Sequence, residues 1–357
     1  MITLSDLRSA QSLLRGVAVR TRLIELPQAV WGKPPGREVQ CPLRAGEARL
    51  LLKPENQQPI GAFKLRGAYN KIASLSEDDR KRGVISYSSG NHAQGVAYAA
   101  RALNVKAVIV MPNNAPPVKR EATAGLGAEI VVVGPGSDER KTKAEELAAQ
   151  HGYVIVPPYN DEKIIAGQGT IGLEILEDLL KADPLKEGLS EQDLAQKEDL
   201  EQVEATVFSP VGGGGLISGV AAAIKLRNPK VKVIGVEPEL AADAQASLRA
   251  GKIIQFPAEQ VSRTIADGLR TQSIGPVNFE HIQKYVDHIV TVSEDEIRRA
   301  MKLLAVNPAT VAEPSGAVAT AGFLFRSDHL PKTNLNVAII SGGNIEPHML
   351  EQLRKGE

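Results

Sequence analysis

Short apolar runs alternate along the chain with stretches of helical spacing. The apolar runs that we expect to be strands occupy residues 84–87, 107–111, 129–133, 153–156, 205–208, 231–236 and 337–340. The stretches that we expect to be helices include residues 93–103, 118–125, 138–150 and 216–226. Nearly continuous apolar strands that are each separated by a helix are typical of a parallel sheet covered on both faces. The pattern therefore predicts the α/β class.

The same pattern predicts two doubly wound lobes with parallel sheets. We assign residues 83–158 to a small domain inserted into a large domain of residues 1–82 and 159–357. Segment 181–204 is rich in Lys, Glu, Asp and Gln, so we expect a solvated insertion there. In doubly wound sheets the ligand binds at the carboxyl ends of the strands, and the chemistry is expected at that edge.

Composition and charge limit the possible partners. The chain has 42 basic and 42 acidic residues, and this balance argues against nucleic acid or an anionic membrane as partner. A single cysteine, Cys41, excludes a disulfide framework within the chain. The first residues lack the pattern of a signal peptide, and no apolar run approaches the roughly 20 residues of a membrane span. We expect a cytoplasmic protein with a small-molecule ligand.

Lys64 stands between a flexible Gly-Ala approach and an apolar, helix-compatible run. Burial disfavours the charged form of an amine, so a lysine held against protein loses its proton more readily. A neutral lysine amine is a nucleophile toward aldehydes and forms Schiff bases. Lys64 is therefore a candidate catalytic residue, although a surface lysine near a helix start would give the same local pattern.

Four consecutive glycines, Gly212 to Gly215, follow a predicted strand and precede a predicted helix. Such a run lets several N–H groups converge on one anion beside a helix N-terminus, which predicts a phosphate-binding loop. A dinucleotide fingerprint would need Gly or Ala at its sixth place, where Ile217 or Ser218 stands. Glu237 nevertheless lies where a ribose-binding acid is expected, so a nucleotide-binding protein without covalent chemistry is an alternative.

A third candidate also lies between a predicted strand and a predicted helix. It consists of Ser88, Ser89, Gly90, Asn91 and His92. Hydroxyls, an amide and the free N–H groups of a helix start can together hold a carboxylate. The alternative is an ordinary helix whose N-cap is a serine.

A lysine suited to an imine, a phosphate loop and a carboxylate-binding turn together describe a site for pyridoxal phosphate and an amino acid. On these motifs the chain resembles the fold type II pyridoxal-phosphate family, in the group of serine/threonine dehydratases and serine racemase, with a fold like tryptophan synthase β. The resemblance runs from about residue 50 to residue 344 and includes runs at residues 165–171, 264–268, 313–316 and 341–344. It implies pyridoxal phosphate as cofactor, an amino-acid substrate and a homodimer.

The resemblance also implies roles for individual residues. The cofactor would be bound by Phe63, Lys64, Asn91, Gly212, Gly213, Gly214, Gly215, Leu216 and Ser341. Lys64 would carry the cofactor and remove the α-proton, Phe63 would pack against the ring, and Asn91 would bond the ring hydroxyl. Ser341 would face the pyridine nitrogen. A neutral hydroxyl there makes the ring a weaker electron sink, which favours elimination over transamination.

The remaining implied roles concern the substrate and a metal ion. The substrate would bind the turn formed by Ser88, Ser89, Gly90, Asn91 and His92. Ser89 also stands where serine racemases carry a second acid/base group, so it is a second candidate catalytic residue. Mg²⁺ or Ca²⁺ would be bound by Glu237, the carbonyl of Ala241 and Asp243. The alternative there is an acidic strand end that faces water.

The activity that the resemblance implies is the β-elimination of L-threonine or L-serine to a 2-oxo acid and ammonia. Serine racemase and L-threo-3-hydroxyaspartate ammonia-lyase are the alternatives among enzymes. Arg270 bears on the second of these. A guanidinium that points inward would favour a β-carboxylate, whereas one that points outward, as most arginines do, leaves threonine or serine.

Overall fold

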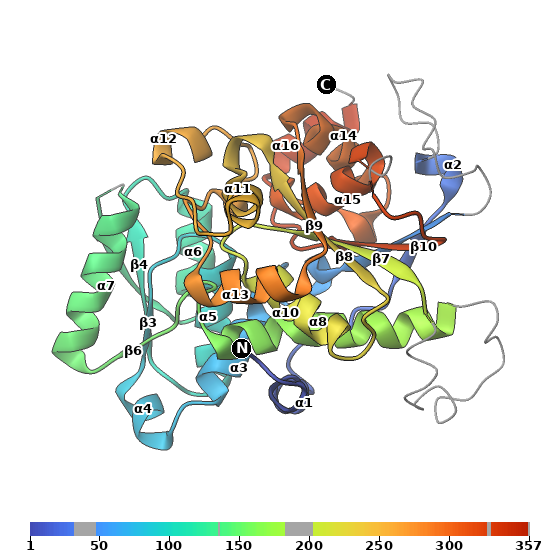
Figure 1. Ribbon diagram of the computed structural model, residues 1–357. Coiled ribbons are helices and arrows are strands. Elements are labelled where there is room, and N and C mark those ends of the chain that lie inside the picture. The colour runs from blue at the N-terminus through green and yellow to red at the C-terminus, as the bar shows by residue number, and fades with distance from the viewer. Residues whose placement is uncertain (32–47, 135, 183–202, 327–329, 356–357) are drawn as a thin grey trace.

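The structure is a computed structural model that describes residues 1–31, 48–134, 136–182, 203–326 and 330–355. Most of the predicted insertion at residues 181–204 lies outside these residues, as does Cys41. The described part of the chain forms two sheets with helices packed around each (Figure 1).

The larger sheet has six strands. They are β1 (Ile24–Leu26), β2 (Arg49–Pro54), β7 (Ala205–Pro210), β8 (Lys232–Pro238), β9 (His288–Val292) and β10 (Leu335–Ile340). Their order is β1-β2-β10-β7-β8-β9, and all neighbours are parallel except β1, which runs antiparallel to β2. Every residue of β7 and β10 is buried, as expected for strands covered on both faces.

The smaller sheet has four parallel strands. They are β3 (Val84–Ser86), β4 (Ala107–Pro112), β5 (Glu129–Val133) and β6 (Val154–Ile155), in the order β5-β4-β3-β6. All four come from the segment that we assigned to a small domain, whose bounds at 83 and 158 stay a prediction. The predicted α/β class with parallel sheets is confirmed, while the antiparallel edge strand β1 was not predicted.

Helices cover both faces of the larger sheet. One face is covered by α1 (Leu4–Leu13), α8 (Glu162–Ala182), α10 (Gly215–Lys225) and α13 (Pro276–Tyr285). The other face is covered by α14 (Glu294–Leu304) and α15 (Pro314–Arg326). Because α10 is enclosed by the sheet and other helices, every residue from Gly215 to Ile224 is buried and the helix is apolar on all sides.

Helices also cover both faces of the smaller sheet. One face packs against α3 (Lys64–Ala73) and α5 (Asn91–Ala102), and the other against α7 (Ser137–His151). The remaining helices are α2 (Gln28–Trp31), α4 (Glu77–Arg82), α6 (Pro117–Gly125), α11 (Asp243–Ala250), α12 (Ala258–Val261) and α16 (Pro347–Lys355). Since α3 packs against both α5 and α8, it joins the two parts of the molecule.

The carboxyl ends of three neighbouring strands carry the predicted motifs. The glycine run follows β7, Ser341 follows β10, and the segment that leads to Lys64 follows β2. These strands are adjacent and parallel, so their carboxyl ends meet at one edge of the sheet. In the smaller sheet, the turn at residues 88–92 follows β3 in the same way. The sheet order therefore gathers motifs that are far apart in the sequence.

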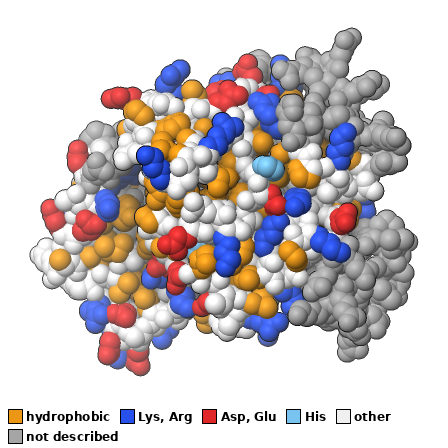
Figure 2. All heavy atoms as spheres, in the orientation of Figure 1, with side chains coloured by type: hydrophobic (Ala, Val, Ile, Leu, Met, Phe, Trp, Pro, Cys, Tyr) orange, Lys and Arg blue, Asp and Glu red, His pale blue; other side chains and the backbone are white. Residues whose placement is uncertain are grey.

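The surface gives little sign of a large charged partner. On the face shown in Figure 2, basic and acidic side chains are interspersed, and neither sign forms a continuous patch. In the described ranges, none of the helices is both long and apolar enough to cross a membrane.

Candidate active site

Lys64 is the first residue of α3, and its amine points toward the segment after β6. Lys64 Nζ donates a hydrogen bond to the carbonyl of Pro158 at 2.7 Å and lies 5.2 Å from the centroid of the Phe63 ring. The surrounding protein keeps water from the amine, and this burial lowers the pKa of Lys64 to about 8. About a tenth of such amines are neutral at pH 7, compared with less than a thousandth for an ordinary lysine.

The approach to Lys64 runs along the segment that follows β10. Phe63 N–H donates to the carbonyl of Ser341 at 3.0 Å, and Ala62 forms an isolated bridge with Gly342. Gly61 has a φ of +69°, which favours glycine, and a Cβ there would lie 2.3 Å from Asn344 Oδ1. Lys64, Phe63 and the predicted cofactor residue Ser341 are therefore neighbours.

A buried group of four charged side chains anchors the other side of α3. Arg66 donates to both carboxylate oxygens of Glu55, at 2.8 and 2.9 Å, and to both of Glu174, at 2.7 and 3.0 Å. Lys53 also pairs with Glu174. Arg66 is 2% exposed, and Glu55 and Lys53 are fully buried. Two cations and two anions are thus enclosed together, and they tie the helix that carries Lys64 to β2 and α8.

The glycine run presents free N–H groups at the start of α10. Gly214 is the N-cap residue, with a φ of +92° and no side-chain cap. In the described part of the chain, no hydrogen bond uses the N–H groups of residues 213–216. Consecutive unpaired N–H groups at the positive end of a buried helix are suited to an anion such as phosphate.

Packing gives a second reason for glycine at these positions. A Cβ on Gly213 would lie 2.3 Å from Cδ1 of Tyr159, and one on Gly215 would lie 2.9 Å from Tyr159 Cβ. A Cβ on Gly214 would lie 2.9 Å from Asn278 Cβ. The Tyr159 ring therefore lies directly against the loop. The argument that four glycines indicate a phosphate is weaker than the sequence suggested, and the free N–H groups are the stronger indication.

The turn at residues 88–92 is not a serine-capped helix. The N-cap of α5 is Gly90, which provides no side-chain cap, while Ser88 Oγ accepts a weak hydrogen bond from Gly90 N–H at 3.4 Å. The interpretation of this turn as a helix with a serine N-cap is therefore wrong, and its first N–H groups stay free for a ligand. Ser89 is half-buried, and none of the hydrogen bonds of the described residues involves its hydroxyl.

His92 is buried, so its ring does not lie on the surface of the turn. Its Nε2 lies 3.0 Å from the carbonyl of Val156, and because a carbonyl only accepts, Nε2 carries the proton. Burial and the nearby charge of Lys64 lower the pKa of His92 to about 3, so the ring is neutral. Among the described residues, Nδ1 has no hydrogen-bond partner. A contribution of His92 to substrate binding would come through its backbone.

Glu313 is a site residue to which the sequence analysis gave no role. Asn91 Nδ2 donates to Glu313 Oε1 at 2.6 Å, and Asn91 Oδ1 accepts from Asn344 Nδ2 at 2.7 Å. Both ends of the Asn91 amide are thus fixed. Burial and the carboxylate of Asp267 raise the pKa of Glu313 to about 7. The run at residues 313–316 was quoted for the family resemblance, and it was the available signal.

The proposed metal ligands form a buried acidic pair. Glu237 and Asp243 are both fully buried, so the alternative of an acidic strand end that faces water is wrong. The two carboxylate oxygens of Glu237 accept from the N–H groups of Ala244 and Gln245, at 2.9 and 2.8 Å. Among the described residues, both carboxylate oxygens of Asp243 are buried without a partner. Burial raises the pKa of Asp243 to about 7, and burial together with Asp243 raises that of Glu237.

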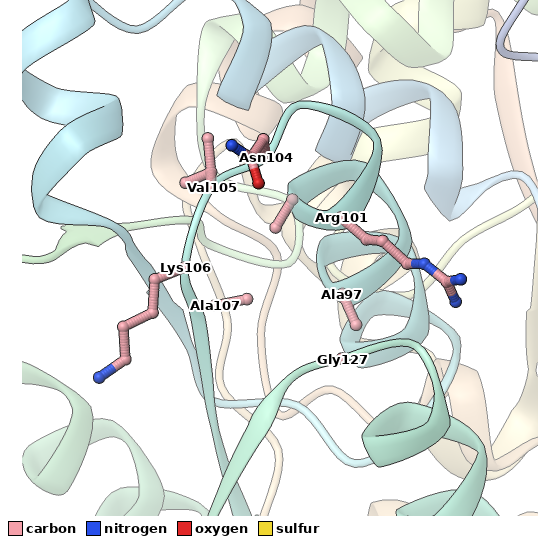
Figure 3. A pocket seen from close by; sticks show the side chains of 8 residues that line it. Ala97, Arg101, Asn104, Val105, Lys106, Ala107 and Gly127 are labelled. Carbon is pink, nitrogen blue, oxygen red and sulfur yellow. The ribbon is translucent and has the colours of Figure 1, made fainter.

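A hollow of about 290 Å³ lies away from these residues, at the end of α5 and the start of β4. In Figure 3 the side chains of Arg101 and Lys106 point away from each other, and small residues such as Ala97 and Ala107 line the space between them. A ligand site needs polar groups that converge. This hollow lacks them, so we do not assign it a ligand.

The lysine, the glycine loop, the carboxyl-end turn and the fixed asparagine together define an enzyme site for a phosphate-bearing aldehyde. The description "Pyridoxal-phosphate dependent enzyme" matches residues 39–342, and the chain belongs to this family.

Individual relatives are more specific. The chain is 44% identical to the L-threonine ammonia-lyase of Thermotoga maritima over 99% of this chain and 78% of that protein. It is 40% identical to the L-threo-3-hydroxyaspartate ammonia-lyase of Saccharomyces cerevisiae over 87% of each chain. Among solved structures, a threonine deaminase from the organism abbreviated T.th. superposes with a TM-score of 0.81 at 38% identity, covering 97% of this chain and 99% of that one.

Proposed function

We propose that the protein is a pyridoxal-phosphate-dependent ammonia-lyase that converts L-threonine, or L-serine, to a 2-oxo acid and ammonia. The observation that carries the proposal is the amine of Lys64, whose pKa is lowered to about 8 and which hydrogen-bonds the carbonyl next to Tyr159, the residue packed on the glycine loop. Relatives named for threonine deamination that align with nearly the whole chain support the same substrate.

The residues present fit the cofactor. Free N–H groups at residues 213–216 suit its phosphate, and the amine of Lys64 suits its aldehyde. Phe63, Asn91, Leu216 and Ser341 complete the proposed set. When bound, pyridoxal phosphate would supply an aldehyde for the substrate's amino group and a ring that withdraws electrons from the α-carbon.

Lys64 would be the base of the reaction. As a neutral amine it would accept the proton from the α-carbon of the substrate, and a pKa near 8 makes that neutral form accessible at neutral pH. The carbonyl of Pro158 accepts a hydrogen bond from the same amine, so it can hold the protonated form. The pKa of the base and its anchoring therefore both come from this chain.

The substrate carboxylate would lie at the start of α5. The free N–H groups there, with the hydroxyls of Ser88 and Ser89, would bind it. Asn91 is held at both ends by Glu313 and Asn344, so its amide cannot rotate freely. L-Threonine would lose water between its α- and β-carbons, and addition of water to the resulting imine carbon would release ammonia and 2-oxobutanoate.

Two observations weigh against the alternatives. The guanidinium of Arg270 donates to the carbonyl of Thr264, at 2.9 and 2.6 Å, and Arg270 is exposed. This outward position favours threonine or serine over 3-hydroxyaspartate. Glu237 is fully buried and bonds two N–H groups at the start of α11, so it is not available to a ribose, which weighs against nucleotide binding.

A divalent cation, Mg²⁺ or Ca²⁺, is part of the proposal. Two unpartnered oxygens on a buried aspartate fit a hard cation, with Glu237 and the carbonyl of Ala241 as further ligands. A cation there should raise the melting temperature of the protein, and Asp243→Asn should abolish that rise. We also propose a cytoplasmic homodimer, on the family resemblance; light scattering tests the dimer.

Side-by-side rates on L-threonine, L-serine and L-threo-3-hydroxyaspartate test the substrate assignment. We expect 2-oxobutanoate from threonine at the highest kcat/KM. Chiral analysis of the serine recovered from the reaction tests the racemase alternative, for which Ser89 is the relevant residue. Accumulation of D-serine faster than pyruvate would make racemisation the main activity and contradict the proposal.

A further inference from the structure

The segment at residues 156–160 lies between the lysine and the glycine loop. Residues 157 and 158 are both prolines, which lack N–H groups and have fixed φ angles, so this stretch is stiff and its carbonyls are free to accept. One of them, the carbonyl of Pro158, accepts the hydrogen bond from Lys64 Nζ at 2.7 Å. The position of this segment therefore determines where the amine is held.

The upstream end of the segment is fixed to the smaller sheet. Val156 N–H donates to the carbonyl of Ile85 at 2.8 Å. The carbonyl of Val156 accepts from Ser86 Oγ at 2.8 Å and from His92 Nε2 at 3.0 Å. Three bonds to β3 and α5 thus hold this end, and none of them depends on the glycine loop.

The downstream end is fixed to the glycine loop by Tyr159. Its ring is in such close contact with Gly213 that a Cβ there would lie 2.3 to 2.4 Å from three ring atoms. Its carbonyl accepts from Asn278 Nδ2 at 3.3 Å, and Asn160 Oδ1 accepts from Val277 N–H at 3.0 Å. These bonds join the segment to α13. The tightest contact with the loop itself is the ring.

We propose that Tyr159 is a positioning residue: its ring, seated on Gly213, holds the Pro158 carbonyl at the amine of Lys64 and so couples the phosphate-binding loop to the lysine. The inference rests on the proposed function for its catalytic meaning, but the coupling is a property of this chain alone. The coupling requires the ring and not the hydroxyl, because the contacts with Gly213 are made by ring carbons.

The experiment compares Tyr159→Ala, Tyr159→Leu and Tyr159→Phe with the wild type and with a control, Tyr153→Ala. Tyr153 is a tyrosine of the smaller lobe whose ring contacts Lys106 and His151. In protein stripped of cofactor, the rate at which an amine reagent labels Lys64 is measured against pH by peptide mass spectrometry. This rate reports the pKa of the amine without any turnover. Affinity for inorganic phosphate is measured in parallel.

Removal of the ring should admit water to the amine and raise its pKa by at least about one unit, because burial is what lowers it. At pH 8 the labelling of Lys64 should then fall about fivefold in Tyr159→Ala and Tyr159→Leu. Phosphate should bind these two variants more weakly, while Tyr159→Phe and Tyr153→Ala should match the wild type in both readouts.

Two results would overturn the inference. One is a folded Tyr159→Ala or Tyr159→Leu, by circular dichroism, that labels Lys64 like the wild type. The other is a Tyr159→Phe that behaves like Tyr159→Ala, since the hydroxyl would then be the active group. Failure of the proposed function would be seen separately, as a wild-type protein that forms no oxo acid from threonine while its Lys64 labelling still depends on the Tyr159 ring.

Discussion

Replacement of Arg66 by methionine should destabilise the protein more than loss of an ordinary surface arginine. Methionine keeps much of the side-chain length but removes the charge that faces Glu55 and Glu174. Glu55 is fully buried and would keep only neutral partners, Thr21 and Gln58. The group of two cations and two anions would become one cation and two anions in a water-excluded space.

The expected loss is about 3–5 kcal/mol, which is typical of a buried charge that loses its partner. The entropy of unfolding of a 357-residue chain is about 0.75 kcal/mol/K, so the melting temperature should fall by about 4–7 °C. Thermal and urea unfolding should be followed without cofactor, because a bound ligand adds its own stabilisation. Arg49→Met is the matched control. Arg49 pairs with Glu25 on the surface, so its loss should be below about 1 kcal/mol.

A second substitution tests the reason for the loss. In Arg66→Met with Glu55→Gln, the remaining charges are Lys53 and Glu174, which pair with each other. The double variant should therefore be more stable than Arg66→Met alone, although it has lost one more native group. If the two substitutions simply add, or if the double variant is the less stable, then uncompensated charge is not the cause and the reasoning is refuted.

Two further predictions concern the site. Glu313→Gln should become progressively more stable than the wild type between about pH 4.5 and pH 7 and then level off, because the wild-type carboxyl, with its pKa raised to about 7, binds its proton more tightly in the folded state; the difference should not exceed about 3 kcal/mol, and melting curves across pH that stay parallel would contradict it. Gly213→Ala should weaken the binding of pyridoxal phosphate at least about tenfold, since the new Cβ would lie 2.3 Å from the Tyr159 ring. Gly125→Ala, where a Cβ meets no atom within 4 Å, is the control for equilibrium titration, and equal affinities for the two variants would contradict the steric argument.

The sheets could be predicted from the sequence because their strands are buried on both faces and read as continuous apolar runs. β7 and β10 are examples, with all six residues of each buried. The edge strand β1 has only three residues, of which one is buried, so it leaves no such pattern. Its antiparallel pairing with β2 depends on tertiary contacts that a local pattern does not contain.

Parts of the candidate site were equally accessible from sequence. Lys64 and the glycine run each combine a residue type with a position between a strand and a helix, and local sequence shows both features. What it could not show was the direction of side chains. His92 lies in the predicted turn but turns inward to Val156, and Glu313 reaches Asn91 from 222 residues away. Tyr159 gave no signal, because its importance comes from contact with glycines far along the chain.

The most direct test of the account is the visible absorption of the purified protein with pyridoxal phosphate, before and after L-threonine is added, beside Lys64→Ala. We predict a visible band in the wild type that is absent in Lys64→Ala, that changes when threonine is added, and that is accompanied by 2-oxobutanoate. A wild-type protein that stays colourless with the cofactor, or a Lys64→Ala variant with the same band and the same product, would contradict the central role of Lys64.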